Sequence, residues 1–294
     1  MSTRGEAMTQ SQAETAGLAR VFPRRTNATP TDALAFVGDP PMFLPPIERV
    51  HISVAFTWDL PEAERLARAW EHVAPVSIGG PATGKPGGQF VPGRYLRPGY
   101  TITSRGCPNH CWFCSVWPRE GTTREFAIRD GWDVLDDNLL RCSPEHISAV
   151  FSMLDRQPNR PKFTGGLEAS VLTAEVAERL RSLRPEAIFF AYDTPDDLPS
   201  LRRAAELLRN AGIPFAGHRV RSYVLCGYSG DEIGLAEIRM REVVSTGITP
   251  MAMQWCDEDG KGFPGWGRFV RRWSRPAIIA SKKKRRASLF GGAP

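Results

Sequence analysis

Three of the six cysteines of this chain lie close together in one short segment. Cys107, Cys111 and Cys114 fall within residues 104–115, which read SRGCPNHCWFCS. Thiolates are soft ligands that suit iron–sulfur clusters, zinc and copper(I). A structural metal site normally takes four protein ligands, whereas this C-x3-C-x2-C spacing supplies three from one loop. The spacing therefore predicts a metal centre with one open position, where a substrate or cofactor can bind.

The same spacing, with the aromatic Phe113 directly before the last cysteine, resembles the radical S-adenosylmethionine (radical SAM) superfamily. The resemblance implies a [4Fe-4S] cluster on the three cysteines, with S-adenosylmethionine chelating the fourth iron through its amino and carboxylate groups. One electron then splits a carbon–sulfur bond, and the 5′-deoxyadenosyl radical abstracts hydrogen from a substrate. It also implies a one-electron donor such as flavodoxin or ferredoxin. A zinc or redox thiol site, and three unrelated structural cysteines, remain as alternatives.

Length and composition favour one main globular domain. The chain has 294 residues, of which 41% are hydrophobic, enough to bury an ordinary core. No segment approaches the ~18 consecutive apolar residues of a membrane span, and residues 1–30 lack the apolar core of a signal peptide. We expect a cytoplasmic protein without a membrane segment, whose cysteines stay reduced.

The region before the cysteines divides into two parts. Residues 1–47 are predicted to be a disordered or extended arm, because their first thirty residues lack a sustained apolar period and prolines follow. Residues 48–97 are predicted to form a β-α-β extension. Alternating apolar residues over 50–56 indicate a strand, a helix follows Pro61, and residues 75–79 indicate a second strand.

Two nucleotide or cofactor motifs are incomplete in this extension. Residues 79–86 nearly spell a phosphate-binding loop, but Pro86 stands where a Ser or Thr would bind magnesium. No D-x-H-x-x-G segment is present to support cobalamin, and His51 is better explained as a structural residue of its strand. Residues 1–106 contain no cysteine, which disfavours the second cysteine set of the methylthiotransferase relatives.

From residue 98 to residue 260, strands and helices alternate, which is typical of a parallel sheet with helices outside. The resemblance implies a partial (β/α)6 TIM-like barrel here. Ser143 and Thr173 are each predicted to begin a helix, and Gly212 to end one. The six predicted strands are residues 100–103, 134–140, 161–166, 187–193, 223–227 and 248–255.

Polar residues and glycines follow several of these strands, where chemistry gathers in parallel architectures. Taken singly, each fits an ordinary turn or helix cap. Together they are expected to surround one mouth of the sheet, where the resemblance implies cofactor binding by Asp136, Asp137, Asn138, Gly165, Gly166, Glu168 and Asp193.

The resemblance assigns roles to some of these residues. A Gly-Gly-Glu-like segment at the second strand of the family holds the amino group of S-adenosylmethionine. Gly165, Gly166 and Glu168 have that composition but follow the third predicted strand, while residues 136–138 have the expected place, so both sets are candidates. Asp193 is expected near the cofactor's ribose and Phe113 near its adenine. Arg219 and Arg221 can supply positive charge for a carboxylate or phosphate, although an ordinary surface arginine is the simpler interpretation.

The last segment has a different character. Residues 261–294 contain ten Lys/Arg and no Asp/Glu, while the rest carries 28 basic and 32 acidic residues, so this segment makes the net charge of +6. Trp266, Phe269 and Trp273 alternate with arginines, and residues 282–286 are all basic. Such a segment suits phosphate backbones, with aromatics for base stacking. The alternative is a helix that packs its tryptophans on the main domain, followed by a solvated end.

The sequence therefore predicts a radical SAM enzyme whose substrate is a nucleic acid or nucleotide-derived molecule, or alternatively a peptide or small metabolite. The competing class is a non-enzymatic iron–sulfur or zinc module that binds nucleic acid. Cys142, Cys226 and Cys256 are isolated and are predicted to be free thiols, so no auxiliary cluster is expected.

Overall fold

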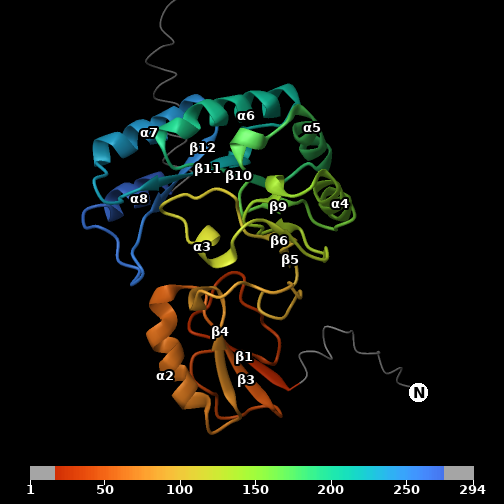
Figure 1. Cartoon of the computed structure of the whole chain (residues 1–294), viewed down its shortest axis with the longest axis vertical. Coiled ribbons are helices and arrows are strands. Elements are labelled where there is room, and N and C mark those ends of the chain that lie inside the picture. The colour runs from red at the N-terminus through yellow and green to blue at the C-terminus, as the bar shows by residue number, and fades with distance from the viewer. Residues whose placement is uncertain (1–16, 275–294) are drawn as a thin grey trace, which may run out of the picture. The chain divides into compact units, whose positions relative to one another are not determined.

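The computed structural model describes residues 17–274 of the chain. The chain divides into two compact units (Figure 1). The first contains the described residues up to Ile102 together with Arg129–Gly131, and the second contains Thr103–Ile128 and the residues from Trp132 onward. All the predicted cysteine ligands and cofactor-binding residues belong to the second unit.

The first unit is built on a four-stranded parallel sheet of order β2-β1-β3-β4. The helix α2 (Leu60–Trp70) connects the last two strands and buries Ala63, Leu66 and Trp70. β3 and β4 pair in parallel on either side of this helix in the sequence, which is the β-α-β order expected within residues 48–97. The strands are β1 (Leu18–Phe22), β2 (Ala35–Val37), β3 (Arg49–Ser53) and β4 (Val76–Gly79).

The structure differs from the predicted arm over residues 1–47, since β1 and β2 both lie in that range. β1 was not predicted because the charged Arg20 at its centre interrupts the apolar pattern of the strand. Its guanidinium is buried and donates hydrogen bonds to the carbonyls of Gly93 and Arg94, at 2.6 and 2.9 Å. It also forms an ion pair with Asp32. These partners let a charged residue occupy an interior strand. Residues 1–16 lie outside the described part of the chain.

The second unit is built on five parallel strands, in the order β12-β11-β10-β9-β8. The short strand β5 (Tyr100–Thr101) belongs to the first unit. The prediction of an α/β architecture with a parallel sheet is confirmed. The five strands are β8 (Asp133–Val134), β9 (Lys162–Phe163), β10 (Ala187–Tyr192), β11 (Val220–Cys226) and β12 (Thr249–Gln254).

Helices follow one another along one side of this sheet (Figure 1). Ser143 accepts a hydrogen bond from the His146 amide and Thr173 from the Val176 amide, so both predicted helix starts are confirmed. Gly212 has a φ of 79°, as expected of a helix end. The apolar faces of these helices pack on β10 and β11 to form the main core. They are α4 (Pro144–Asp155), α5 (Ala174–Leu183), α6 (Leu198–Asn210) and α7 (Ile233–Ser245).

The strands near the cysteines are shorter than predicted. The predicted strand over 134–140 is only β8, followed by a turn of 3₁₀ helix at Leu139–Arg141, and the strand over 161–166 is only β9. The chain also forms a small antiparallel pair, β6 (Ser104–Arg105) with β7 (Arg124–Glu125), on either side of the short helix α3 (Val116–Glu120). β8 and β9 thus end before the residues that contact the cysteine loop, Asp136–Asn138 and Glu168.

The beginning of the basic segment belongs to the core of the second unit. Helix α8 (Gly267–Trp273) buries Phe269 and Trp273, and Trp266 is buried at its start. The indole N–H of Trp273 donates a 2.8 Å hydrogen bond to Glu237 of α7. These three aromatic rings are therefore not exposed for base stacking, and the packed-helix alternative is correct for residues 266–273. The basic run at residues 282–286 lies outside the described residues.

Among residues 17–274, no helix is both long and apolar enough to cross a membrane.

Because the Trp273 ring is 1% exposed, Trp273→Ala should destabilise the protein by about 3–5 kcal/mol. The exposed Arg268 on the same helix provides the matched control, and Arg268→Ala should change stability by less than about 0.5 kcal/mol. Urea unfolding followed by circular dichroism measures both values. Equal unfolding midpoints for the two variants would contradict a structural role for this tryptophan.

Candidate metal and cofactor site

The loop that carries the cysteines begins at β6 and returns to β7. Gly106 has a φ of 91°, and a side chain there would meet the Thr122 carbonyl at 2.2 Å, so only glycine fits this position. The Cys107 amide donates a 3.0 Å hydrogen bond to the Gly121 carbonyl, which closes the loop on itself. All three cysteine residues are half-buried.

Asp136 fixes the chain just before this loop. One carboxylate oxygen accepts from the Thr103 amide at 2.7 Å, and the other accepts from the hydroxyls of Thr103 and Ser104 at 2.6 and 2.7 Å. Burial raises the pKa of Asp136, and these three donors oppose that effect. Asp136, which the sequence assigned to cofactor binding, thus directs its hydrogen bonds to the strand that leads into the cysteine loop.

The next two residues, Asp137 and Asn138, contact the following residues of the loop. Asp137 accepts a 2.9 Å hydrogen bond from the Gly106 amide and forms a 3.0 Å ion pair with Arg105. The side-chain amide of Asn138 donates to the Cys107 Sγ at 3.3 Å. Consecutive residues at the end of β8 therefore hold consecutive residues of the chain up to the first cysteine. An N–H donor to a ligand sulfur is also one of the interactions that set the reduction potential of a cluster.

Glu168 joins the cysteine loop to the ends of two strands. Its carboxylate accepts hydrogen bonds from Asn138 at 2.7 Å, from Arg141 at 2.8 Å, from Asn109 at 3.0 Å and from Ser170 at 2.5 Å. Burial alone would raise the pKa of Glu168, but the Arg141, Ser170 and Asn138 donors outweigh burial and lower this pKa to about 2. Glu168 is therefore a fixed negative charge next to the cysteines. The two candidate sets of the sequence, residues 136–138 and residues 165–168, lie in one site.

The two glycines before Glu168 are needed for close approach of the backbone. A side chain on Gly165 would lie 2.2 Å from the Asp136 carbonyl oxygen, and the Gly165 amide donates to the Val134 carbonyl at 3.0 Å. Gly166 has a φ of 94°, which favours glycine. These glycines bring the end of β9 against the end of β8, so that Glu168 reaches Asn138.

Asp193 follows β10 and carries a buried oxygen, Oδ1, that has no hydrogen-bond partner in the described structure. Burial, together with the nearby negative charge of Asp197, raises the pKa of Asp193 from 3.8 to about 7. Burial also raises the pKa of Cys111 to about 11, and the neighbouring Cys114, Cys107 and Asp193 add to this shift. Asp193 and the cysteines are thus close enough to influence one another electrostatically.

Aromatic side chains flank the loop. Phe113 is half-buried and makes an edge contact with Trp112, with ring centroids 5.3 Å apart. Trp112 is 62% exposed and lies 5.4 Å from the ring of Tyr228, just beyond β11. His110 packs on Trp117 at 4.7 Å. The loop therefore extends from the end of β8 to the end of β11.

A second group of potential metal ligands lies behind the loop. The ligand atoms of Asp136, Cys142 and His146 are buried and lie within 4.8 Å of one another. However, Asp136 already accepts three hydrogen bonds, and the His146 Nε2 is 3.0 Å from the Thr103 hydroxyl. The described contacts of this group are therefore explained by a hydrogen-bond network that supports the loop.

The donor set suits an iron–sulfur cluster with an organic cofactor beside it. Three thiols come from one loop, and a buried acceptor without a partner, Asn138 Oδ1, lies next to Cys107. Asp193 Oδ1 is a second acceptor of this kind. Buried polar atoms normally have partners, and both oxygens have room in their hydrogen bonding for a group that carries donors.

The sequence did not identify the residues that hold Glu168 and the loop. Arg141 and Asn109 bind Glu168, and Arg105 binds Asp137. Their positions depend on how the strand ends meet, so the only signal in the sequence was their closeness to predicted site residues.

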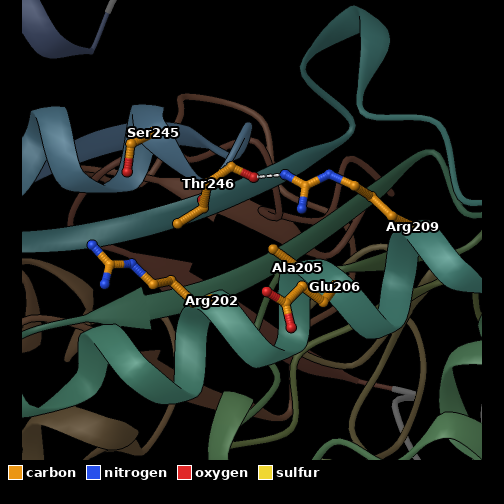
Figure 2. Close-up of a pocket in the computed structure, with 6 residues that line it drawn as sticks. All are labelled: Arg202, Ala205, Glu206, Arg209, Ser245 and Thr246. Atoms are coloured by element: carbon orange, nitrogen blue, oxygen red, sulfur yellow. Dashed lines mark hydrogen bonds between the residues drawn. The ribbon is translucent and has the colours of Figure 1, made fainter.

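A surface pocket lies elsewhere, between α6 and the end of α7 (Figure 2). Arg209 donates there to the carbonyl of Thr246, and Arg202 and Glu206 line the same hollow. None of the predicted site residues contributes to it, so this pocket is separate from the cysteine site.

No family model matches the chain, and no curated protein gives a significant match to it.

The raised pKa of Asp193 gives a stability prediction for the metal-free protein. Between about pH 4 and pH 7 the unfolded carboxyl ionises while the folded one keeps its proton, so wild-type stability falls through this window. Asp193→Asn removes this loss. The variant should gain stability relative to wild type as the pH rises from 4 to 8, by on the order of a few kcal/mol.

Chemical denaturation at several pH values measures this difference. Asp196→Asn, an exposed neighbour, is the matched control and should change little with pH. A constant stability difference between wild type and Asp193→Asn across pH 4–8 would show that Asp193 ionises normally.

Proposed function

We propose that this chain is a radical SAM enzyme, in which Cys107, Cys111 and Cys114 bind a [4Fe-4S] cluster and S-adenosylmethionine binds beside them. One observation carries the proposal: a loop with three thiols is fastened by Asn138 to a fixed carboxylate, Glu168, at the ends of two parallel strands. We further propose that the parallel sheet is the partial (β/α)6 barrel of this superfamily, since its strands follow one another in chain order.

The chain's own residues have distinct tasks in this proposal. The three thiols are ligands, and Asn138 donates to the sulfur of Cys107 and so stabilises its negative charge. Asp136 and Asp137 keep the loop in register, as their hydrogen bonds all go to residues 103–106. These roles are to position the metal ligands and to tune their charge.

Glu168 and Asp193 are the proposed acceptors for the organic cofactor. Glu168 is negatively charged across the physiological range and suits the cofactor's amino group, in keeping with the Gly-Gly-Leu-Glu sequence. The unpartnered oxygen of Asp193 suits a hydroxyl donor such as a ribose, and Phe113 offers an aromatic face for adenine. When bound, the cluster supplies the electron that cleaves the sulfonium, and a flavodoxin or ferredoxin is the proposed donor to it.

The substrate is less directly indicated. Because Trp266, Phe269 and Trp273 are buried, base stacking no longer supports a nucleic-acid substrate. The basic residues 282–286 still support it through attraction to phosphates. A small organic substrate is favoured by the sheet face on which Ala191 and Met253 are exposed.

The cluster is tested by anaerobic reconstitution with iron and sulfide. Wild type should bind about four irons per chain and show a broad absorbance that dithionite bleaches. Cys111→Ala should lose both, because only two ligands remain. Cys256→Ala, which alters an exposed cysteine, should keep both. One bound zinc without visible absorbance would instead support the zinc-module alternative.

Cofactor cleavage is tested with the reduced, reconstituted protein. Wild type should convert S-adenosylmethionine to 5′-deoxyadenosine and methionine, slowly in the absence of substrate. Glu168→Gln should keep its iron and lose at least about tenfold in this rate, because the cofactor's ammonium loses a charged acceptor. Glu175→Gln on the exposed face of α5 is the control and should retain the rate. Chromatography of the products measures both, and S-adenosylhomocysteine as the sole product would contradict the proposal.

A further inference from the structure

The parallel sheet of the second unit has two different faces. Side chains alternate along a strand, and Ile188, Phe190 and Tyr192 of β10 belong to the core formed with the helices. The intervening residues Phe189 and Ala191 therefore point to the opposite face. The register pairs Phe189 with Arg221 and Ala191 with Tyr223, which places these residues of β11 on that same face.

Three of these side chains form a stack. The rings of Phe189 and Tyr223 lie 4.9 Å apart at 19° to each other. The guanidinium carbon of Arg221 lies 5.2 Å from the centre of the Phe189 ring, and its Nε donates to the His218 carbonyl at 2.7 Å. The aromatic ring and this hydrogen bond fix the guanidinium in place.

Arg221 makes no ion pair with any residue in the described range, which leaves its terminal N–H groups for another acceptor. The other charges on nearby strands have partners. Lys162 pairs with Glu186 at 3.1 Å, and Asp133 accepts a hydrogen bond from Thr164. Arg219, two residues earlier, has a buried Nε without a hydrogen-bond partner. Arg221 therefore presents a positive charge that is held in a rigid position and has no ion-pair partner among the described residues.

The face beside Arg221 is open and apolar. Ala191 is exposed although it lies in the central strand β10, where a covered sheet would bury it. On the other side of β11, Met251 pairs with Tyr223, and Met253 is 42% exposed. Apolar surface next to a fixed cation suits a molecule with an apolar body and one anionic end.

We propose that this face binds an organic anion, whose carboxylate or phosphate is held by Arg221 and whose apolar part lies along Tyr223, Ala191 and Met251. The inference rests on the proposed function, because the bound anion would be the substrate of the proposed radical SAM enzyme. Arg221 is level with Phe189, four residues before Asp193, so the anionic group lies about 13 Å from the cofactor end of the strand. The substrate class is accordingly an elongated anion that reacts at the end remote from its charge.

The experiment compares charged and neutral probes of the same shape. Ligand-observed NMR titrations of the full chain, without reductant or S-adenosylmethionine, use 4-phenylbutyrate against 4-phenylbutanamide and phenyl phosphate against phenol. At least one anion should bind at least tenfold more tightly than its neutral analogue. The stronger of the two anions identifies the source as a carboxylate or a phosphate.

Arg221→Gln should abolish this preference, a loss of roughly ten- to a hundredfold in anion affinity. Arg202→Gln on exposed α6 is the matched control and should retain the preference. Residues 282–286 are present in all variants, so their contribution to anion binding cancels. Arg221→Lys keeps the charge if the glutamine variant fails to fold, and it should retain part of the preference.

Equal affinity of wild type for charged and neutral probes would overturn the proposal, as would an unchanged preference in a folded Arg221→Gln protein. The titration requires neither a cluster nor S-adenosylmethionine. A failure of the radical SAM assignment in the iron and cleavage assays is therefore distinguishable from a failure of this anion site.

Discussion

The register between residues 136–138 and residues 103–107 is the interaction on which the rest of the site depends. Three consecutive side chains at the end of β8 each hold the next part of the chain that enters the cysteine loop. The carboxylates of Asp136 and Asp137 accept from the backbone amides of Thr103 and Gly106, and the Asn138 amide donates to the Cys107 sulfur. The loop is thereby located by side chains at the carboxyl end of the sheet, beside Asp193 and Glu168.

This arrangement also places negatively charged groups close to one another. In the proposed site, the Cys107 thiolate and the Glu168 carboxylate are both negative, and their repulsion has to be offset. Asn138 donates to both Cys107 and Glu168, and Arg141 forms an ion pair with Glu168. The Cys107 sulfur and the Glu168 carboxylate are acceptors, and Asn138 and Arg141 supply donors to them. Buried polar groups are compatible with folding when their hydrogen bonds are satisfied in this way. At Asp193 a hydrogen bond from the Leu225 backbone lowers the pKa, but burial and the negative charge of Asp197 outweigh it, so the pKa of Asp193 is raised.

Local chemistry predicted much of this architecture. The helix starts at Ser143 and Thr173 follow from short-range hydrogen bonding, and the alternation of strands and helices indicated the parallel sheet. The same rules missed β1, because the buried Arg20 has partners more than seventy residues away. They also extended β8 too far, since a strand pattern does not reveal that the next residues bind a distant segment. Long-range partners were the information that the sequence lacked.

The roles of the site residues also divide into those that local sequence predicts and those that depend on long-range contacts. The spacing of the cysteines predicted three ligands, and the composition of residues 136–138 and 165–168 marked both as candidates. Which carboxylate holds the loop and which is placed to face the proposed cofactor depends on contacts between strand ends. Asp136 directs its described hydrogen bonds to the loop, while Glu168 combines loop contacts with a position beside Asn138.

Mössbauer spectroscopy of protein reconstituted with ⁵⁷Fe tests the central claim most directly, because it distinguishes irons by their ligands. Three thiolates on a [4Fe-4S] cluster leave one iron without a cysteine. Addition of S-adenosylmethionine should therefore change the isomer shift and quadrupole splitting of one iron site and leave the other three as they were. A spectrum that S-adenosylmethionine does not alter would contradict a cluster with an open iron beside Glu168 and Asp193.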